Sequence, residues 1–282
     1  MTALRLIIDF FAAADGWRQW AMLVTICAAS GMAIYFAFGG WLYAKYYRRR
    51  REDAQAWKIQ PKRFLSPKQH RWAIKVAISN LLLGGLLSGT FIYYLQHGGY
   101  SALYFDPYER GLWWIPLSTV LLFLSLEAAA YYTHRWLHGK WMFKHVHRWH
   151  HRCVAPTPFT TVTMHPVEFI SLQATAFVPI FIIPAWAGSF VFLLIYVLLY
   201  NIKDHSGIVL TSRLPWQGSS RFHDDHHVYF HCNYGQNLPI FDKLHGTHRR
   251  VNRRYGEDVF GGKGAPLGEG GTDDDEPEWV EY

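Results

Sequence analysis

The stretch LWWIPLSTVLLFLSLEAAAYYTHRWLHGKWMFKHVHRWHH (residues 112–151) joins an apolar segment directly to a histidine-rich one. Its first half is long enough to cross a hydrocarbon core, because a helix needs roughly 20 apolar residues to span about 30 Å. Its second half places histidines in two sets with helical spacing. The stretch therefore predicts a membrane-spanning helix that ends in a polar module able to bind metal.

Three other apolar segments accompany this one. Residues 21–44 and 73–95 meet the same length criterion as 112–132, with Trp and Tyr near their ends as in an interfacial belt. Residues 169–200 are too long for one crossing and short for two, and prolines interrupt them, so we expect a helical hairpin; one long tilted helix or a buried soluble helix is the alternative. The predicted fold class is an all-α, multi-pass integral membrane bundle of about three spans plus a hairpin, with a cytoplasmic histidine-rich di-metal cap.

Charge is distributed unevenly between the loops that join the predicted spans. Residues 45–75 carry eleven Lys and Arg against two acidic residues, whereas residues 96–111 carry one Arg, one Asp and one Glu. Basic loops remain in the cytoplasm, so we expect residues 45–75 there, in the endoplasmic reticulum or a bacterial inner membrane. The third span and the hairpin then bring every histidine-rich segment to the cytoplasmic side.

The same patterns divide the chain into three parts. Residues 1–111 form a transmembrane region with the basic loop, and residues 256–282 form a tail with nine acidic residues and one Lys. Residues 112–255 form a histidine-rich domain, for which the resemblance described below implies a catalytic role. We expect this tail to be disordered and solvated. Because the tail carries −8, the overall charge of +7 leaves +15 on the rest. That balance suits anionic lipid or an acidic electron carrier better than nucleic acid.

Histidines recur at helical spacing in several short segments. A helix advances about 100° per residue, so each of the sets HRWLH, HRWHH and HDDHH is expected to point in one direction. These sets hold eight histidines, and His205, which follows the apolar segment 169–200, is the ninth. Nine imidazoles exceed what one four-coordinate ion accepts. We therefore predict two transition-metal ions with mostly nitrogen ligands. The candidate ligands are His134, His138, His147, His150, His151, His205, His223, His226 and His227.

The other histidines and the cysteines fit simpler roles. His70, His97, His145 and His248 are each isolated from these sets, and we interpret them as satisfied polar residues at a membrane interface. Three cysteines, two of them expected in a reducing compartment, predict no disulfide framework. Metal ligation by Cys153 or Cys232 is a minor alternative.

Glu127 is an acidic residue within a predicted span. It lies seven residues before His134 and eleven before His138, so a continuous helix places it on their face and about 10 Å deeper. A carboxylate in lipid is costly, and we expect it to orient an imidazole or to lie beside the metals. An interhelical hydrogen bond without chemistry is the open alternative. Asp204, Asp224 and Asp225 are candidates for the same supporting role.

Several of these motifs together resemble the fatty acid hydroxylase and sterol desaturase superfamily. They are HRWLH, HRWHH, HPVE (165–168), DHSG (204–207), HDDHH and NYGQNLPIFDKLHGTHR (233–249), and the last is most similar to sterol C-5 desaturases. The resemblance covers roughly residues 115–250. It implies an integral membrane di-iron enzyme with the nine histidines as iron ligands, and it adds His165 and Glu168 to the supporting or catalytic candidates.

Three positions depart from the pattern of that superfamily. Relatives usually have Asp at the position of Glu127, and some hydroxylases have a further His at the position of Asn201. His231 stands where relatives often have Asn or Lys. We therefore keep Asn201 and His231 among the supporting candidates, and His231 is also considered as an additional ligand or a group on the substrate side.

The implied chemistry defines the expected cofactors and partners. Histidine-ligated iron binds O2 and, with two electrons, supports attack on an unactivated C–H bond. We expect two iron ions, replaceable by zinc during purification, with O2 as co-substrate and a membrane lipid as substrate. The sequence resembles no haem- or flavin-binding domain, so a small cytochrome, or a ferredoxin with its reductase, is expected to supply electrons.

Desaturation of a sterol-like lipid is the favoured function. The main alternative within the same superfamily is hydroxylation of a fatty acid, sphingoid or sterol lipid. A histidine-rich metal transporter and a catalytically inactive scaffold are more remote alternatives.

Overall fold

The computed structural model describes residues 16–212, 214 and 216–267 of the 282-residue chain. Its described part is built mainly of helices, with two short two-stranded sheets. The helical elements are α2 (Gly16–Ile34), η1 (Tyr35–Gly39), α3 (Gly40–Leu42), η2 (Tyr43–Arg48), α4 (Ala54–Trp57), α5 (Pro67–Gln96), α6 (Trp114–Leu137), α7 (Lys140–Met142), η3 (Phe143–His147), α8 (Arg148–His151), α9 (Pro166–Phe177), η4 (Pro179–Phe181), α10 (Ala187–Asp204), α11 (Ser220–Tyr229) and α12 (Ile240–His245). The strands are β1 (Leu103–Tyr104), β2 (Ala185–Trp186), β3 (Arg253–Arg254) and β4 (Ala265–Pro266).

Four helical segments are long and apolar enough to cross a membrane. They are Gly16–Arg48, Pro67–Gln96, Trp114–Leu137 and Ala187–Asp204, and the first runs without a break from α2 to η2. At most 33% of each segment's apolar window is buried within the protein. The remaining apolar surface faces outward, where a bilayer would cover it. The predicted all-α, multi-pass class is confirmed.

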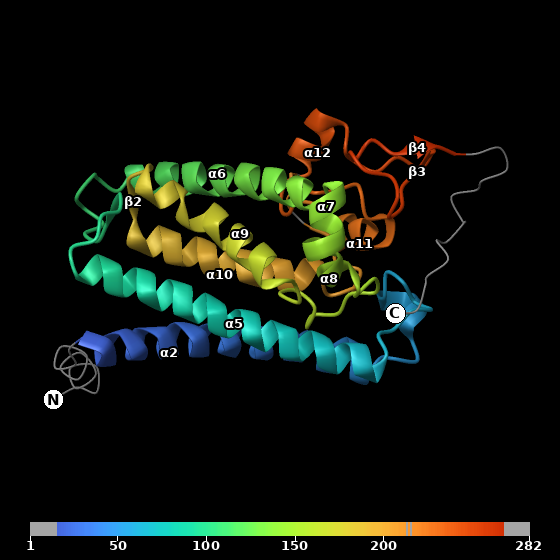
Figure 1. Ribbon diagram of the computed structural model, residues 1–282, viewed down its shortest axis with the longest axis horizontal. Coiled ribbons are helices and arrows are strands. Elements are labelled where there is room, and N and C mark those ends of the chain that lie inside the picture. Colours follow the sequence, from blue (N-terminus) through green and yellow to red (C-terminus); the bar gives the residue numbers. More distant parts are fainter. Residues whose placement is uncertain (1–15, 213, 215, 268–282) are drawn as a thin grey trace.

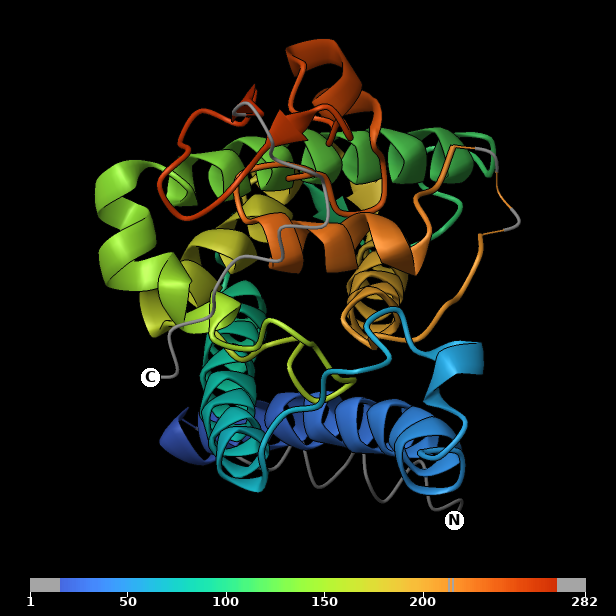
Figure 2. The ribbon, with the colours of Figure 1, turned by 90° about the vertical axis from the view of Figure 1, so that its right-hand side faces the viewer.

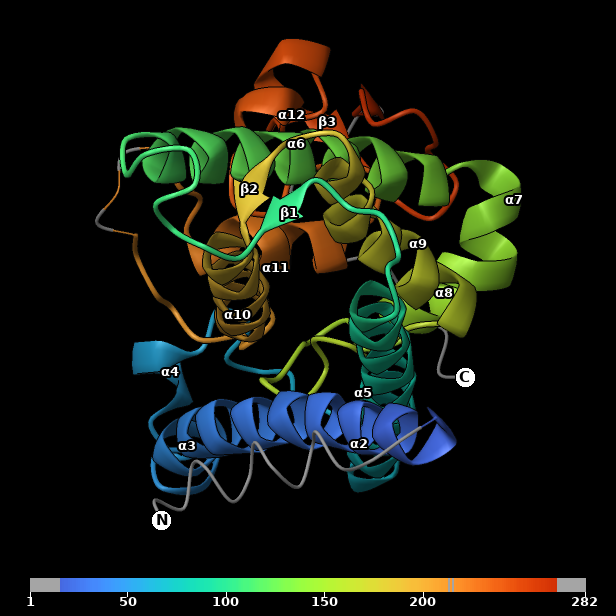
Figure 3. The same cartoon turned by 90° about the vertical axis from the view of Figure 1, so that its left-hand side faces the viewer.

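The fourth apolar region forms the expected hairpin. Its first arm is α9 and η4, its second arm is α10, and the turn between them contains β2. β2 pairs in parallel with β1 from the loop between α5 and α6 (Figure 3). This pairing places the hairpin's tip at the end of the bundle opposite the histidines. His205, just after α10, therefore returns to the same end as the close of α6 (Figure 1).

The helices form two layers, with α2 and α5 side by side in one and α6, α9 and α10 in the other (Figure 1). Glycines allow the close approach of α2 and α5. A Cβ atom added at Gly85 would lie 2.4 Å from the Cβ of Ala28, and one at Gly89 would lie 2.5 Å from the Cα of Val24. Small residues at i and i+4 are a common device for helix packing in membranes. The Gly85–Gly89 pair was not among the predicted features.

The segment between α8 and α9 connects the two layers at the histidine end. The Asn80 side-chain amide donates hydrogen bonds to the carbonyls of Val162 and Met164, both at 2.8 Å. The Tyr35 hydroxyl donates to the carbonyl of Phe159 at 2.6 Å. The predicted transmembrane region 1–111 thus packs directly against the predicted catalytic domain.

The first part of the tail that we expected to be disordered from residue 256 is folded. Residues 256–267 are folded, because β4 pairs antiparallel with β3 and Glu257 forms an ion pair with Arg148 at 3.0 Å. The Phe260 ring lies 4.5 Å from that of His231. The prediction of disorder was wrong for this segment, where tertiary contacts outweigh its glycine-rich composition. The acidic stretch 268–282 lies outside the described residues.

Gly89→Leu should destabilise the protein, because its side chain would overlap the α2 backbone and force the two helices apart. We expect the free energy of unfolding to fall by about 1–3 kcal/mol, which a thermal unfolding assay in detergent can detect. Gly40→Leu is the control, since a Cβ atom there has nothing within 4 Å. Equal stability of the two variants would contradict close glycine packing.

Candidate metal centre

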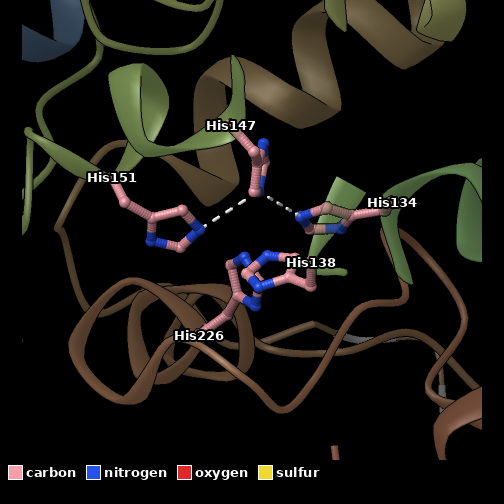
Figure 4. Close-up of side chains that lie close together, drawn as sticks. All are labelled: His134, His138, His147, His151 and His226. Atoms are coloured by element: carbon pink, nitrogen blue, oxygen red, sulfur yellow. Dashed lines mark hydrogen bonds between the residues drawn. The ribbon is translucent and has the colours of Figure 1, made fainter. Parts of the chain in front are cut away.

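Two groups of buried histidines are supplied by α6, η3, α8, α11 and the residues that directly follow α6 and α10. Figure 2 shows α11, in orange, below α6, in green. The first group consists of His134, His138, His147, His151 and His226, and the second of His150, His205, His223 and His227. In each group, one nitrogen from every ring lies within 4.8 Å of the others. Figure 4 shows the rings of the first group turned toward one another. All nine predicted candidates are therefore brought together, in a set of five and a set of four.

Each of two sequence sets is divided between the groups. His147 and His151 join the first group whereas His150 joins the second; on α11, His223 and His227 join the second group whereas His226 joins the first. The expectation that each set points in one direction was wrong for HRWHH and HDDHH, whereas both histidines of HRWLH lie in the first group. Residues at i and i+4 share a helix face, but adjacent residues diverge by about 100°. One short helix can therefore supply both groups.

The groups are also neighbours. The ring centroids of His151 and His227 are 5.0 Å apart, and those of His223 and His226 are 5.2 Å apart. Both of these ring pairs join one member of each group. The two groups adjoin each other, and α11 contributes ligands to both.

Backbone carbonyls orient four of the rings. The Nδ1 atoms of His134, His226, His150 and His205 lie 2.8, 2.6, 3.2 and 2.9 Å from the carbonyl oxygens of Tyr234, Cys232, Thr163 and Asn201 respectively. A carbonyl oxygen only accepts, so the network assigns the proton of each neutral ring to Nδ1. Each Nε2 then carries a lone pair, which is the form that binds a metal.

These lone pairs meet inside the groups. The Nε2 atom of His205 lies 3.1 Å from that of His150 and 2.9 Å from that of His223. In the pair His150 and His205, both Nδ1 atoms already hold the proton, so no hydrogen bond can join the two Nε2 atoms. The buried Nε2 atoms of His138 and His226 have no hydrogen-bond partner. A cation between such nitrogens would remove this repulsion, and the donor set therefore fits a metal.

Burial keeps these imidazoles neutral. Loss of solvation lowers the pKa of His205 to about 4. Burial, together with the neighbouring imidazoles, also holds the pKa well below the ordinary value for His138, His147, His150, His151, His223, His226 and His227. Neutral rings at physiological pH are ready to bind metal without first losing a proton.

Glu168 is the predicted carboxylate that contacts a ring of the site. Its Oε1 atom lies 2.8 Å from Nδ1 of His147, and both side chains are 1% exposed. The other end of the HPVE motif has a structural role, because Nδ1 of His165 accepts a hydrogen bond from the backbone N–H of Val167 and caps α9. His165 thus helps to fix the helix turn that carries Glu168.

His231 lies outside both groups and supports the first one. Its Nε2 atom is 3.3 Å from the Glu257 carbonyl oxygen, and its Nδ1 atom is 3.1 Å from Nδ1 of His138. The carbonyl must accept, so the Nε2–H of His231 donates and its Nδ1 accepts from His138. His138 is thereby held with its Nε2 lone pair free. This position agrees with the placement of His231 among the supporting candidates and gives no support to its role as an additional ligand.

Glu127 holds a loop of the cap. Its carboxylate accepts hydrogen bonds from the backbone N–H groups of Asn237 and Leu238 at 3.0 and 2.9 Å and from the Asn237 side-chain amide at 2.6 Å. None of its hydrogen bonds within the described chain reaches an imidazole. The loop that it fixes contains Tyr234, whose carbonyl orients His134. Glu127 therefore acts on the ring indirectly, which is closer to the alternative of a packing role.

The aspartate candidates lie around the second group without joining it. Asp224 accepts a hydrogen bond from the Gln60 side chain at 2.9 Å, and burial raises its pKa to about 7 against the opposing effect of Lys58. Asp225 lies 3.7 Å from Arg249, and Asp204 is buried beside Tyr200. Asn201 contributes its backbone carbonyl to His205. Gln60 and Lys58 belong to the basic loop and were not among the predicted residues.

The histidines that we interpreted as interfacial lie outside the groups, as do the cysteines. His70, His97, His145 and His248 contribute to neither group, and Cys153 and Cys232 are buried thiols that also contribute to neither. Cys232 participates through its carbonyl oxygen. The residues that sequence reasoning missed are mainly such backbone acceptors, which leave no signature in side-chain patterns.

Residues 119–247 match the family model described as fatty acid hydroxylase. Two Delta(7)-sterol 5(6)-desaturases of Gibberella zeae are 30% and 29% identical over 82% and 83% of this chain, which corresponds to 64% and 71% of those proteins. A Delta(7)-sterol 5(6)-desaturase of Candida albicans is 28% identical over 86% of this chain and 61% of its own. The chain thus spans about two thirds of the length of these relatives. No solved structure matches it.

Glu127→Gln should destabilise the loop that Glu127 holds. If Glu127 only packed between helices, Gln would be tolerated. The carboxylate accepts three hydrogen bonds, and an amide replaces one acceptor oxygen with a donor that faces N–H groups. We expect a loss of about 1–3 kcal/mol of unfolding free energy and reduced metal retention through His134. Thermal unfolding and metal analysis of Glu127→Gln beside Glu127→Asp provide the test. A Gln variant as stable as the native protein would contradict this role.

Proposed function

We propose that this chain, which belongs to the fatty acid hydroxylase family as its motifs predicted, is a membrane di-iron oxidoreductase that desaturates a sterol-like lipid. The observation that carries the proposal is the division of nine buried histidines into two adjoining groups. Similarity to the sterol desaturases supports the substrate class. Four apolar helices support a location in a membrane.

The residues fit iron, and the proposed redox reaction selects iron over zinc. The first group offers five nitrogens and the second four, without a thiolate among them, and imidazole-rich sites suit iron and zinc. Iron bound there would activate O2 for removal of hydrogen from an unactivated C–H bond, a redox reaction that zinc does not support. Zinc is expected to occupy the same nitrogens when iron is scarce during expression.

The protein's own residues would prepare each ligand for this task. Backbone carbonyls, Glu168 and His231 hold six of the nine rings with Nε2 free, so that these rings present a lone pair without reorganisation. The buried cap excludes water from the groups, which protects a strong oxidant from side reactions. Glu127 keeps the loop with Tyr234 in place.

The position of the groups favours a lipid substrate. They include His134 in the last turn of α6 and His205 at the end of α10, and a molecule moving within one leaflet could approach these helix ends. Hydroxylation of the lipid is the alternative outcome at the same site, since both reactions begin with removal of a hydrogen atom. A transporter would need ligands along the spans, whereas these nine share one end of the bundle.

Electrons would come from a separate protein on the cytoplasmic side. A small cytochrome, or a ferredoxin with its reductase, fits this need. The basic loop between η2 and α5 lies at the histidine end of the bundle (Figure 1), and the charge rule places it in the cytoplasm. The reduced partner and the cap would then share one compartment.

Metal content should distinguish the two groups. The purified protein should hold close to two iron or zinc ions, and His226→Ala and His223→Ala should each retain about one, because each removes a nitrogen from a different group. His97→Ala is the control, since its ring lies outside both groups and contacts Tyr93 through a hydrogen bond to the carbonyl and through the ring. Elemental analysis measures the result. Two ions in both group variants would refute the division of ligands.

Lipid analysis tests the reaction itself. Cells that lack sterol C-5 desaturation should form a sterol with two fewer hydrogen atoms when they express the native chain, and none with His226→Ala at equal expression. Mass spectrometry of extracted sterols reads the outcome. A product that instead gains one oxygen atom would replace desaturation by hydroxylation, and unchanged lipids would reject both.

A further inference from the structure

A basic hollow lies on the cap beside α12, away from the histidine groups. It has a volume of about 380 Å³ and is lined by Lys243, Leu244, His245, Arg250, Arg253 and Lys263. None of its Lys and Arg side chains forms an ion pair within the described part of the chain. Four uncompensated cations around one hollow favour an anionic ligand.

The same surface exposes apolar side chains. Ile240 and Leu244 lie four residues apart on α12 and are 53% and 72% exposed. Val251, seven residues after Leu244 in the chain, is 69% exposed. Residues at i and i+4 share a helix face, so α12 presents a short apolar stripe next to the hollow. An apolar stripe beside basic side chains is the pattern of a segment that lies in a membrane interface.

Contacts with α6 place this surface at the level of a bilayer's edge. The Tyr132 hydroxyl lies 3.0 Å from Nε2 of His245, and the Tyr131 ring stacks on the His245 ring at 5.3 Å. Tyr132 and Trp136 are 52% and 56% exposed in the last turns of a candidate span. Exposed aromatic residues there are typical of the headgroup region. Figure 1 shows α12 lying over this end of α6.

We propose that the hollow binds the phosphate of an anionic phospholipid headgroup while Ile240 and Leu244 enter the acyl boundary. An acidic protein would satisfy the charges, but it would leave the apolar stripe at the bilayer edge without a role. Lipid bound there would fix α12, and with it the loop that carries the acceptor for His134. The site goes beyond the proposed reaction and does not depend on metal.

Binding of phosphatidylglycerol to the full chain in neutral detergent, titrated by native mass spectrometry, tests the site. Each Lys or Arg near an anionic lipid contributes about fivefold, so K243Q/R250Q/R253Q/K263Q should lower phosphatidylglycerol affinity at least tenfold. Phosphatidylcholine binding should not change. The matched control R49Q/K62Q/K68Q/R71Q removes four exposed charges at the same end of the bundle and should have less than a threefold effect. Equal losses in both variants would overturn the site, and an acidic partner would then be the better occupant.

Two further arms distinguish the lipid from other anions. I240S/L244S should weaken phosphatidylglycerol binding severalfold, and glycerol phosphate, which lacks acyl chains, should bind far more weakly; equal binding of the two ligands would overturn the membrane assignment. D273N/D274N/D275N/E276Q removes four charges from the acidic tail. A tenfold rise in lipid affinity in this variant would indicate that the acidic tail, and not a lipid, occupies the basic hollow in the native chain, which would overturn the proposal. Metal content should stay constant throughout, so failure here leaves the proposed reaction untouched.

Discussion

Nine imidazoles can be buried at one end of a helical bundle only if they are neutral and their lone pairs converge on something positive. Burial removes the charge by depressing the pKa of the rings. It also leaves the Nε2 lone pairs of His150 and His205 facing each other at 3.1 Å. Without a cation this arrangement is unfavourable. A cation bound between these nitrogens would therefore stabilise the cap.

The loops of the cap act as a second layer that imposes this arrangement. The carbonyl oxygen of Tyr234 accepts a hydrogen bond from His134. Other residues of the motif 233–249 hold this carbonyl in place. Asp242 accepts the backbone N–H groups of Tyr234 and Gly235 at 2.8 and 2.7 Å and the hydroxyl of Thr247 at 2.6 Å. Glu127 holds the other end of the same loop. Two buried carboxylates thus fix one carbonyl, and through it one ligand ring.

Local patterns in the sequence predicted most of the helices and the nine histidines, because both depend on periodicity within a few residues. The hairpin at 169–200 followed from proline positions and from length. The predictions for Glu127 and for residues 256–267 failed because they depend on contacts between residues distant in sequence. The three donors to Glu127 come from residues 237 and 238, and the folded state of residues 256–267 depends on Arg148 and His231. The opposite assignment of His150 and His151 could have been predicted, since adjacent helical residues diverge by about 100°.

The length of α6 connects the site to the bilayer. Its 24 residues extend about 36 Å at 1.5 Å per residue, which exceeds a hydrocarbon core of about 30 Å. His134 lies in the last turn of this helix, with Tyr132 and Trp136 exposed beside it. The first histidine group therefore belongs at the headgroup level, just outside the hydrocarbon. A lipid that carries its polar end at this level could present nearby C–H bonds to the cap without leaving the membrane, whereas a soluble substrate would gain nothing from such a location.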